Sequence, residues 1–462
     1  MGGRLWPTSE MTDRVEGSGR GPATMRSSSA APVPPKRVLL VAPDFPPFPI
    51  GGGARVCQQL ATEYHRLGWE VTVISMNSSR VGGLARTIEV RDAGGRVIFL
   101  PMATRVETSG VSLLLVLPPS LPGLVRLLRE FRRERWDAVH LHGNPAFLVD
   151  AVGLLCRMGS RPYVLTFHGV ISDPARLGWL GGLLYRFLVT FERRIFDRAR
   201  ALTAVSEATL NEVWHVGFRA RRMETIPIGA FLPPPETDTS RERSGTVLAR
   251  FGLNPGNFAL CLGAFIPRKG QDIMLSVFAD LSARRALPES LQLAFAGFER
   301  DRAFSAELRR IVAAARLESR VRFLGEVTEA EKGVLLRGAR WVIMPSRYEA
   351  SPGLAFDAMA LGCVLVAPDL PSFQEVIGEG ANAVLFHAGD PTSLSQALTD
   401  LVREPGREQA IRAAALQRSR SFATWPDVAR AYLELFSNPP TRSDRGISRS
   451  RRSRLRRRRP RE

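Results

Sequence analysis

Two carboxylates stand in the stretch of sequence whose residue types point most directly to chemistry. Glu349 lies in a loop rich in Pro, Ser and Gly, and Asp357 lies eight residues later, about one turn into a predicted helix that starts near Gly353. The free amides at the start of such a helix, at Gly353 and Leu354, favour bound phosphate. A carboxylate accepts two hydrogen bonds from a vicinal diol, which suits sugar and ribose hydroxyls. The stretch therefore predicts a site for a ligand with phosphates and hydroxyls; the alternative is an exposed Glu and a helical Asp without a ligand.

Lysine is rare in this chain, so the position of each lysine carries information. Of the 64 Lys and Arg residues, only Lys36, Lys269 and Lys332 are lysines. Lys269 follows Arg268 and precedes Gly270 in a loop after a predicted strand. A lysine at that place in an arginine-dominated protein favours a phosphate ligand, with Arg268 beside it as a second candidate, over a solvated surface residue.

A glycine run after the first predicted strand could bring the backbone close to a ligand. Gly51, Gly52 and Gly53 follow a proline-rich loop, and glycine permits close backbone approach to a phosphate or sugar. The run does not match the GxGxxG pattern of dinucleotide-binding folds. A plain tight turn is the alternative.

Three histidines stand at predicted strand ends. His168 follows the predicted strand 163–167, and His140 and His142 share one face of another strand. We expect His140 and His142 to line a cleft rather than to catalyse. His168 is the stronger candidate for a functional imidazole.

The elements that must position these residues form two series of short apolar runs separated by helical stretches. The predicted strands are 38–42, 71–74, 138–142, 163–167 and 201–205 in the first series, and 258–262, 291–295, 321–324, 341–344 and 364–367 in the second. Alternation of strand and helix predicts a parallel sheet covered on both faces. The fold class is therefore α/β, with two Rossmann-like doubly wound domains that face each other across a cleft. Ligands of such sheets bind at the carboxyl ends of the strands.

Five segments follow from these patterns and from the distribution of charge. We predict a disordered leader at 1–36 without a secretory signal, a first Rossmann-like domain at 37–230, a linker at 231–245, a second Rossmann-like domain with closing C-terminal helices at 246–437, and a disordered Arg-rich tail at 438–462. The tail accounts for much of the formal net charge of +19. The basic total thus says little about the reaction.

The motifs of the second half resemble those of family 4 glycosyltransferases, which have the GT-B fold. The stretch from Glu349 is similar to that family's Glu-x7-Glu signature followed by Ala-Met-Ala-x-Gly, with Asp357 in place of the second Glu. The resemblance implies that Glu349 contacts the donor sugar and Asp357 the ribose of the nucleotide. It also implies that Lys269 neutralises the donor diphosphate. Ala264 stands where the family usually has Arg, and Arg268 is the candidate substitute.

The resemblance extends to the first half with fewer motifs. It implies that Gly51 and Gly52 form a loop near the donor phosphates and the acceptor, and that the His168 imidazole approaches the donor sugar. Ser206 resembles the family's strand-end Ser. The expected catalytic residues are Glu349, His168 and Lys269.

The function implied is a retaining hexosyltransferase that moves a sugar from a nucleoside diphosphate to a hydroxyl of a glycan or lipid-linked acceptor. Fixed cations stabilise the charge on the leaving β-phosphate. No Asp-x-Asp pair follows a predicted strand, so we expect no metal and no cofactor besides the donor substrate. A non-catalytic sugar-nucleotide-binding relative and a sugar-nucleotide 2-epimerase are the alternatives. A specific nucleic-acid partner is not expected, because the body of the chain holds no recognisable binding module.

The acceptor's location is suggested by two basic amphipathic segments of the first half. Residues 121–135 and 177–200 combine apolar residues with arginines, a composition that can lie on an anionic bilayer. The alternative is that each helix packs on its own sheet with a solvated Arg face. Four cysteines without a CxxC pair fit a reducing compartment. We therefore expect a cytoplasmic enzyme, with peripheral association on the inner face of the plasma membrane as a further hypothesis.

Overall fold

The computed structural model describes residues 36–46, 52–77, 87–92, 95–101, 119–143, 147–169, 178–230 and 238–437. The predicted tail lies outside the described residues, as does the predicted leader apart from Lys36. Gly51, one of the predicted ligand-binding glycines, also lies outside them.

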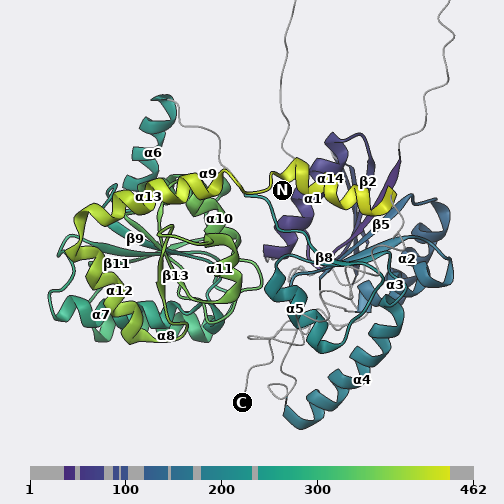
Figure 1. Ribbon diagram of the computed structural model, residues 1–462, viewed down its shortest axis with the longest axis horizontal. Coiled ribbons are helices and arrows are strands. Elements are labelled where there is room, and N and C mark those ends of the chain that lie inside the picture. The colour runs from purple at the N-terminus through teal and green to yellow at the C-terminus, as the bar shows by residue number, and fades with distance from the viewer. Residues whose placement is uncertain are drawn as a thin grey trace, which may run out of the picture.

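The first domain is built on an eight-stranded sheet with the order β3-β4-β2-β1-β5-β6-β7-β8 (Figure 1). All neighbouring strands are parallel except β3 and β4, which are antiparallel. The strands are β1 (Arg37–Val41), β2 (Glu70–Asn77), β3 (Ile88–Asp92), β4 (Gly95–Pro101), β5 (Ala138–His142), β6 (Tyr163–Phe167), β7 (Ala201–Ala204) and β8 (Met223–Thr225). The helices are α1 (Gly52–Arg66), α2 (Leu121–Arg133), α3 (Phe147–Met158), α4 (Gly178–Phe196) and α5 (Glu207–Val216).

The second domain is built on a six-stranded parallel sheet with the order β11-β10-β9-β12-β13-β14. Its strands are β9 (Phe258–Leu262), β10 (Gln292–Ala296), β11 (Val321–Gly325), β12 (Trp341–Ile343), β13 (Val364–Pro368) and β14 (Val384–Phe386). Its helical elements are α6 (Asp238–Arg250), the 3₁₀ turn η3 (Pro267–Lys269), α7 (Gln271–Ala283), α8 (Arg302–Ala314), α9 (Glu329–Gly338), α10 (Gly353–Ala360), α11 (Pro371–Ile377), α12 (Pro391–Arg403) and α13 (Pro405–Ser419). The chain ends its described part in α14 (Trp425–Ser437).

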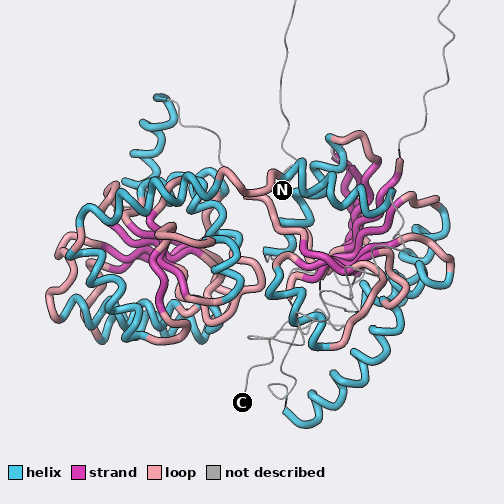
Figure 2. Tube along the Cα trace, viewed as in Figure 1, coloured by secondary structure: helices cyan, strands magenta, loops and turns pink. Residues whose placement is uncertain are grey.

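The prediction of two doubly wound α/β domains is confirmed, and the reason lies in the composition of the central strands. β5, β6 and β13 are buried along their whole length, as expected for parallel strands covered by helices on both faces (Figure 2). The sequence did not predict β3, β4, β8 and β14, which lie at or near the sheet edges. β3 and β8 are only partly covered and have weak apolar patterns, whereas β4 holds the buried apolar run 97–100, which was not recognised as a strand.

Each sheet has a point where the strand order reverses, between β1 and β5 in the first and between β9 and β12 in the second. Loops after the strands at such a point diverge to opposite faces and leave room for a ligand. The predicted site residues follow these strands or their neighbours. The sheet topology alone therefore directs the Gly-rich loop, His168, Lys269 and Glu349 to the strand ends.

Two predicted boundaries differ from the structure. The predicted linker runs to residue 245, whereas α6 begins at Asp238 and packs on α9 of the second domain. The last helix, α14, was assigned to the second domain but packs on α1 and β6 of the first. A Cβ at Gly229 would lie 2.9 Å from the indole ring of Trp425, so glycine lets α14 cross back close to the chain that leaves the first domain.

Candidate active site

The loops that follow β9 and β12 place Arg268 and Lys269 beside Glu349. The Lys269 ammonium forms an ion pair with Glu349 Oε1. Arg268 Nη1 donates to Glu349 Oε2 at 3.3 Å and to the Tyr348 carbonyl at 2.9 Å. The side chain of Ser346 adds a third donor to Glu349, at 2.9 Å. Arg268 and Lys269 thus lie on the same carboxylate, and their role as phosphate ligands stays a prediction.

Glu349 is held as a carboxylate although its side chain is only 7% exposed. Burial by itself raises the pKa of this group, but Lys269, Arg268 and the hydrogen bonds outweigh burial and lower its pKa below the usual value. A buried, ionised acceptor flanked by two cations is suited to orient hydroxyl groups. It also keeps the two cations in place beside a ligand.

The backbone at Gly270 explains why glycine must follow Lys269. Gly270 has φ of +70°, and a Cβ there would lie 1.9 Å from the Pro345 carbonyl oxygen. Only glycine lets the η3 turn pack this tightly against the loop after β12. A bidentate ion pair between Arg347 and Asp272, at 2.7 and 2.8 Å, ties the same two loops together. The Lys269 and Glu349 side chains therefore meet because their loops are held in register.

Asp357 does not join this group and pairs with a different lysine. Lys332 of α9 donates to Asp357 Oδ2 at 2.9 Å, and both side chains are almost fully buried, at 6% and 3% exposed. Lys332 also pairs with Glu329 at 2.6 Å. The sequence analysis noted Lys332 but assigned it no role. The rarity of lysine, which singled out Lys269, would equally have singled out Lys332.

The start of α10 has backbone donors, of which the Gly353 and Ala355 amides already donate to the Ser351 and Pro352 carbonyls, at 3.0 and 2.8 Å. Its N-cap residue is Pro352, and no side chain caps the helix with a hydrogen bond. Gly353 and Leu354 are the first two residues of the helix, as predicted. The uncapped helix start is a suitable place for an anionic group. At the corresponding end of β9, Gln271 donates to the Ala264 carbonyl at 3.0 Å, so Ala264 takes part through its backbone.

The first domain contributes a cluster of buried imidazoles at the ends of β5 and β6. His142 Nδ1 and His168 Nε2 are 3.1 Å apart and share a hydrogen bond. His140 bonds to Tyr64 and to Thr166, each at 2.8 Å. The ring of Tyr432 from α14 lies 4.4 Å from that of His140, centroid to centroid. The prediction that His140 and His142 line a cleft is therefore wrong: both are buried, and the partners packed around His140 leave it no access to a cleft.

Burial keeps this cluster uncharged. It lowers the pKa of His168 to about 4 and lowers the pKa of His142 well below its usual value. Burial also raises the pKa of the nearby Cys57 thiol. Within the described part of the chain, Cys57, His142 and His168 form the one group of three potential metal ligands, with ligand atoms within 4.8 Å of one another. This grouping was not predicted, because Cys57 lies on α1, far from the histidines in sequence.

The remaining predicted glycines lie beside His168. Gly52 opens α1 and faces open space, and a Cβ at Gly53 would lie 3.4 Å from Cγ of His168. The start of α1 therefore packs against the imidazole that the sequence singled out. Gly53, which was not among the predicted site residues, makes that contact.

The two halves of the site meet through specific hydrogen bonds between the domains. Ser206, which caps α5, donates to the Ala350 carbonyl at 2.5 Å. Tyr348 donates to Glu212 at 2.8 Å. A Cβ at Gly169 would lie 3.4 Å from that of Ala350. The loop that carries His168 therefore lies against the loop that carries Glu349, which gives the strand-end Ser206 a positioning role.

Two facing doubly wound domains with cations and a carboxylate at the strand ends define a glycosyltransferase of the GT-B class. Solved structures agree: Anabaena HepE in complex with UDP and glucose superposes with a TM-score of 0.66 at 17% identity, over 87% of this chain and 99% of that one. The chain belongs to the family 4 glycosyltransferases. The model of Glycosyltransferase Family 4 matches residues 50–230, and that of Glycosyl transferases group 1 matches residues 250–418.

Curated relatives cover most of both domains. A D-inositol 3-phosphate glycosyltransferase of Pseudarthrobacter chlorophenolicus is 30% identical over 66% of this chain and 74% of its own length. A phosphatidyl-myo-inositol mannosyltransferase of Mycobacterium leprae is 28% identical over 67% of this chain and 77% of its own length. The family uses nucleotide-sugar donors. Of the helices that the structure describes, none combines the length and apolar character needed to cross a bilayer.

Proposed function

We propose that this protein is a retaining hexosyltransferase that transfers a sugar from a nucleoside diphosphate to a hydroxyl of a glycan or lipid-linked acceptor. The observation that carries the proposal is the contact of Lys269 and Arg268 with Glu349 at the strand ends of the second domain. Two cations beside a buried carboxylate match a ligand that joins a diphosphate to a polyhydroxyl ring. The donor class agrees with the UDP bound to Anabaena HepE.

The proposed roles follow from the charge that develops during transfer. As the bond from C1 of the sugar to the β-phosphate oxygen breaks, negative charge grows on that phosphate, and Lys269, Arg268 and the amides at the start of α10 stabilise it. Glu349 orients hydroxyls of the sugar. The acceptor oxygen attacks C1 from the same face and its proton passes to the departing phosphate, which retains the anomeric configuration. The neutral His168 faces the sugar from the first domain.

Direct assay of the full chain tests this proposal. Incubation with a panel of UDP, GDP and ADP sugars and a range of acceptors should release nucleoside diphosphate and form a glycoside of retained configuration, with chelators leaving the rate unchanged. Glu349→Gln should lower the rate by about 100-fold or more. Absence of release and transfer with every donor, with no effect of Glu349→Gln, would contradict the proposal. Tight donor binding without turnover would indicate a non-catalytic relative, and an epimerised sugar nucleotide would indicate a 2-epimerase.

The acceptor belongs to the first domain in this proposal. A relative acts on phosphatidyl-myo-inositol by its name, and the chain carries a formal net charge of +19. Both favour a lipid-linked acceptor at the inner face of the plasma membrane, with the enzyme in the cytoplasm and bound peripherally to anionic lipid. Sedimentation of the protein with anionic vesicles at low salt, and its release at high salt, is the expected result. Recovery in the supernatant at every salt concentration would contradict the membrane association.

A further inference from the structure

Helix α4 carries a row of large apolar side chains on its outer face. Trp179, Leu183, Phe187 and Phe191 recur every four residues, and they are 84%, 62%, 72% and 49% exposed. We call these four residues the α4 stripe. Spacing of four residues places them on one side of the helix. Aromatic and leucine side chains exposed together in this way mark an interaction surface.

Helix α4 packs on its domain through a face other than the α4 stripe. The opposite side of the helix buries Val189, Ile195 and Phe196 in the core of the first domain. Helix α4 therefore has an inner apolar face that is covered and an outer one that is not. In Figure 1, α4 extends along the lower edge of the first domain and projects beyond its neighbours.

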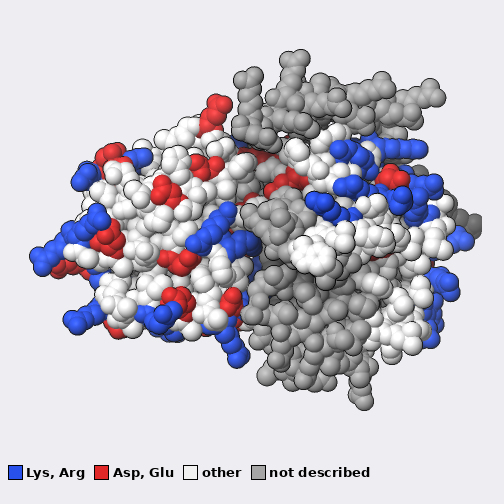
Figure 3. All heavy atoms as spheres, turned by 90° about the horizontal axis from the view of Figure 1, so that it is seen from below, with Lys and Arg blue, Asp and Glu red and all other residues white. Residues whose placement is uncertain are grey.

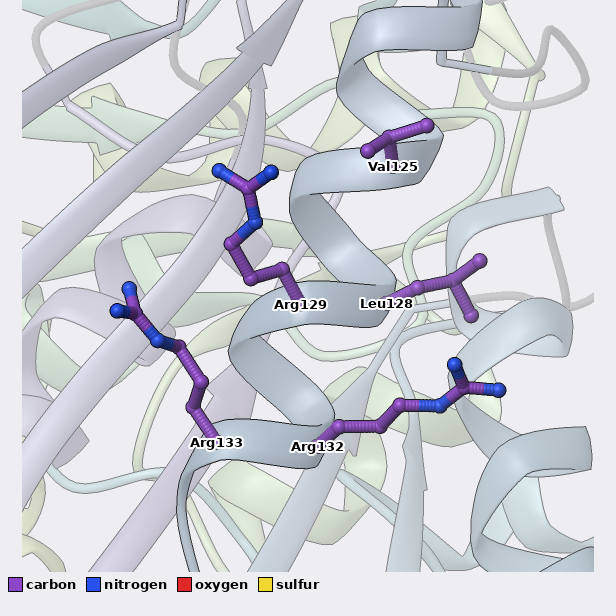
Figure 4. A pocket seen from close by; sticks show the side chains of 5 residues that line it. All are labelled: Val125, Leu128, Arg129, Arg132 and Arg133. Carbon is purple, nitrogen blue, oxygen red and sulfur yellow. The ribbon is translucent and has the colours of Figure 1, made fainter.

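Helix α2 provides the internal comparison, because the sequence predicted the same behaviour for both helices. The apolar residues Leu127 and Phe131 of α2 are buried against the sheet. The outer side of α2 combines Arg129, Arg132 and Arg133 with Val125 and Leu128 (Figure 4), and its Leu121 and Val125 side chains are 75% and 49% exposed. Both helices pack on their domain, but α2 exposes two aliphatic residues among its arginines, whereas α4 exposes a stripe of four residues that holds three aromatic side chains.

Positive charge accompanies the α4 stripe. Arg186 and Arg194 are exposed on the same helix, whereas its single acidic residue, Glu192, is buried. On the visible surface of the first domain, to the right in Figure 3, Lys and Arg far outnumber Asp and Glu. Apolar and aromatic residues bordered by arginines on a helix that lies along a surface are typical of attachment to anionic lipid.

We propose that α4 docks on an anionic membrane surface, with the α4 stripe inserted at the level of the acyl chains and Arg186 and Arg194 against the headgroups. This inference deepens the proposed function, and rests on its lipid-linked acceptor. A second copy of this chain fits the same surface poorly, because a symmetric contact would place the arginines of the two copies near one another. An anionic headgroup layer complements both the apolar and the cationic parts of the helix.

Flotation of the full chain with vesicles tests the docking surface. Vesicles of phosphatidylcholine with about one third phosphatidylglycerol should bind the protein at least about tenfold more strongly than neutral vesicles. Trp179→Ser/Phe187→Ser should weaken binding to the anionic vesicles by about 100-fold. Arg186→Gln/Arg194→Gln should remove most of the preference for anionic lipid. The matched control is Leu385→Ser/Leu416→Ser, which changes two exposed apolar residues of the second domain and should bind as the wild type does.

Three outcomes would overturn the docking surface. The first is a wild-type protein that fails to float with anionic vesicles at any salt concentration. The second is equal flotation of the stripe variant and the wild type. The third is a wild-type dimer in light scattering that Trp179→Ser/Phe187→Ser converts to a monomer, with no flotation of either. Release of nucleoside diphosphate from donor in the absence of lipid should be the same for the wild type and the stripe variant. Loss of that release in both proteins, with flotation as expected, would count against the proposed function and not against the docking surface.

Discussion

The two doubly wound domains share a topology, but the side chains at their strand ends are charged in the second domain and uncharged in the first. At its strand ends the second domain holds two buried or half-buried pairs, Lys269 with Glu349 and Lys332 with Asp357. The first domain places His142 and His168 at the equivalent edge, where burial keeps them neutral. One half of the site is therefore built to hold ionised groups, and the other to exclude charge.

The outer surfaces differ as well. Of the twelve large hydrophobic residues that are exposed among the described residues, Leu385 and Leu416 belong to the second domain and the other ten to the first. A charged donor requires fixed countercharges, whereas a lipid-linked acceptor requires an apolar contact. In the proposed function, the polar strand ends of the second domain bind the donor, and the exposed apolar residues of the first domain contact the membrane.

The buried Lys332–Asp357 pair gives the largest expected effect on stability. Lys332→Met removes the buried cation that pairs with the Asp357 carboxylate, and we expect it to lower the free energy of unfolding by about 3–5 kcal/mol in denaturant titrations. The double variant Lys332→Met/Asp357→Asn should recover much of that loss. Lys36→Met, a lysine outside both pairs, is the control. Equal stability of Lys332→Met and the wild type would break the comparison, because the second domain would then not depend on its ion pair.

Replacement of Lys269 tests whether the other pair serves the reaction. Lys269→Ala should reduce sugar transfer by about 100- to 1000-fold, because a cation aimed at the leaving phosphate is lost. Lys36→Ala should leave the rate unchanged. The rate constants at saturating donor are the measurement. A change in KM alone, with kcat unaffected, would show that Lys269 binds the donor without stabilising the transition state.

Two buried carboxylates of the first domain allow the contrast between the domains to be tested through the pH dependence of stability. Burial, with Asp150 nearby, raises the pKa of Glu192 to about 8, and burial raises that of Asp150 to about 7. The folded protein therefore retains protons on these two groups that the unfolded chain releases. Their contribution to stability is full below about pH 4, under their ordinary pKa values, and is lost as the pH rises through about 7 to 8. Glu192→Gln should stabilise the protein by about 1–3 kcal/mol at pH 8. Glu130→Gln is the matched control.

The control should have the opposite sign. Glu130 is also buried in the first domain, but it pairs with Arg96 and Arg126. Its replacement removes a buried countercharge from both arginines, which still pair with the less buried Glu89, and should destabilise the protein. Unfolding curves of both variants at pH 5 and pH 8 are the measurement. A Glu192→Gln variant that is less stable than the wild type at pH 8 would show that Glu192 is ionised and paired.

The smallest expected effect concerns the pH dependence of catalysis. Since burial lowers the pKa of His168 to about 4, the imidazole is neutral at physiological pH. We expect kcat to show no inflection between about pH 6 and 8, and His168→Gln to reduce it by only about tenfold. An inflection near pH 6.5 that disappears in His168→Gln would contradict a neutral imidazole and would break the contrast between the two domains.

Some of these features were accessible from the sequence because they are local. The apolar runs predicted ten strands, and the order Pro352-Gly353-Leu354 predicted the start of α10. Lys269 was found because lysine is rare and follows a strand end. The rarity of lysine would also have singled out Lys332, but its partner Asp357 could not be identified from the sequence. The interdomain contact of Tyr348 with Glu212 had no local pattern to reveal it.

Residue types and their periodicity by themselves determined the two sheets, the loops that carry chemistry, and the resemblance to family 4 glycosyltransferases. Only the tertiary structure decided which carboxylate meets which lysine, because Asp357 and Lys332 are brought together by the packing of α10 and α9. The structure likewise shows that α4 exposes more apolar residues than α2 does, and that α14 packs on the first domain. The physical reason is that amphipathic patterning specifies how much apolar surface a helix has, whereas the neighbours that cover this surface are set by packing between segments distant in sequence.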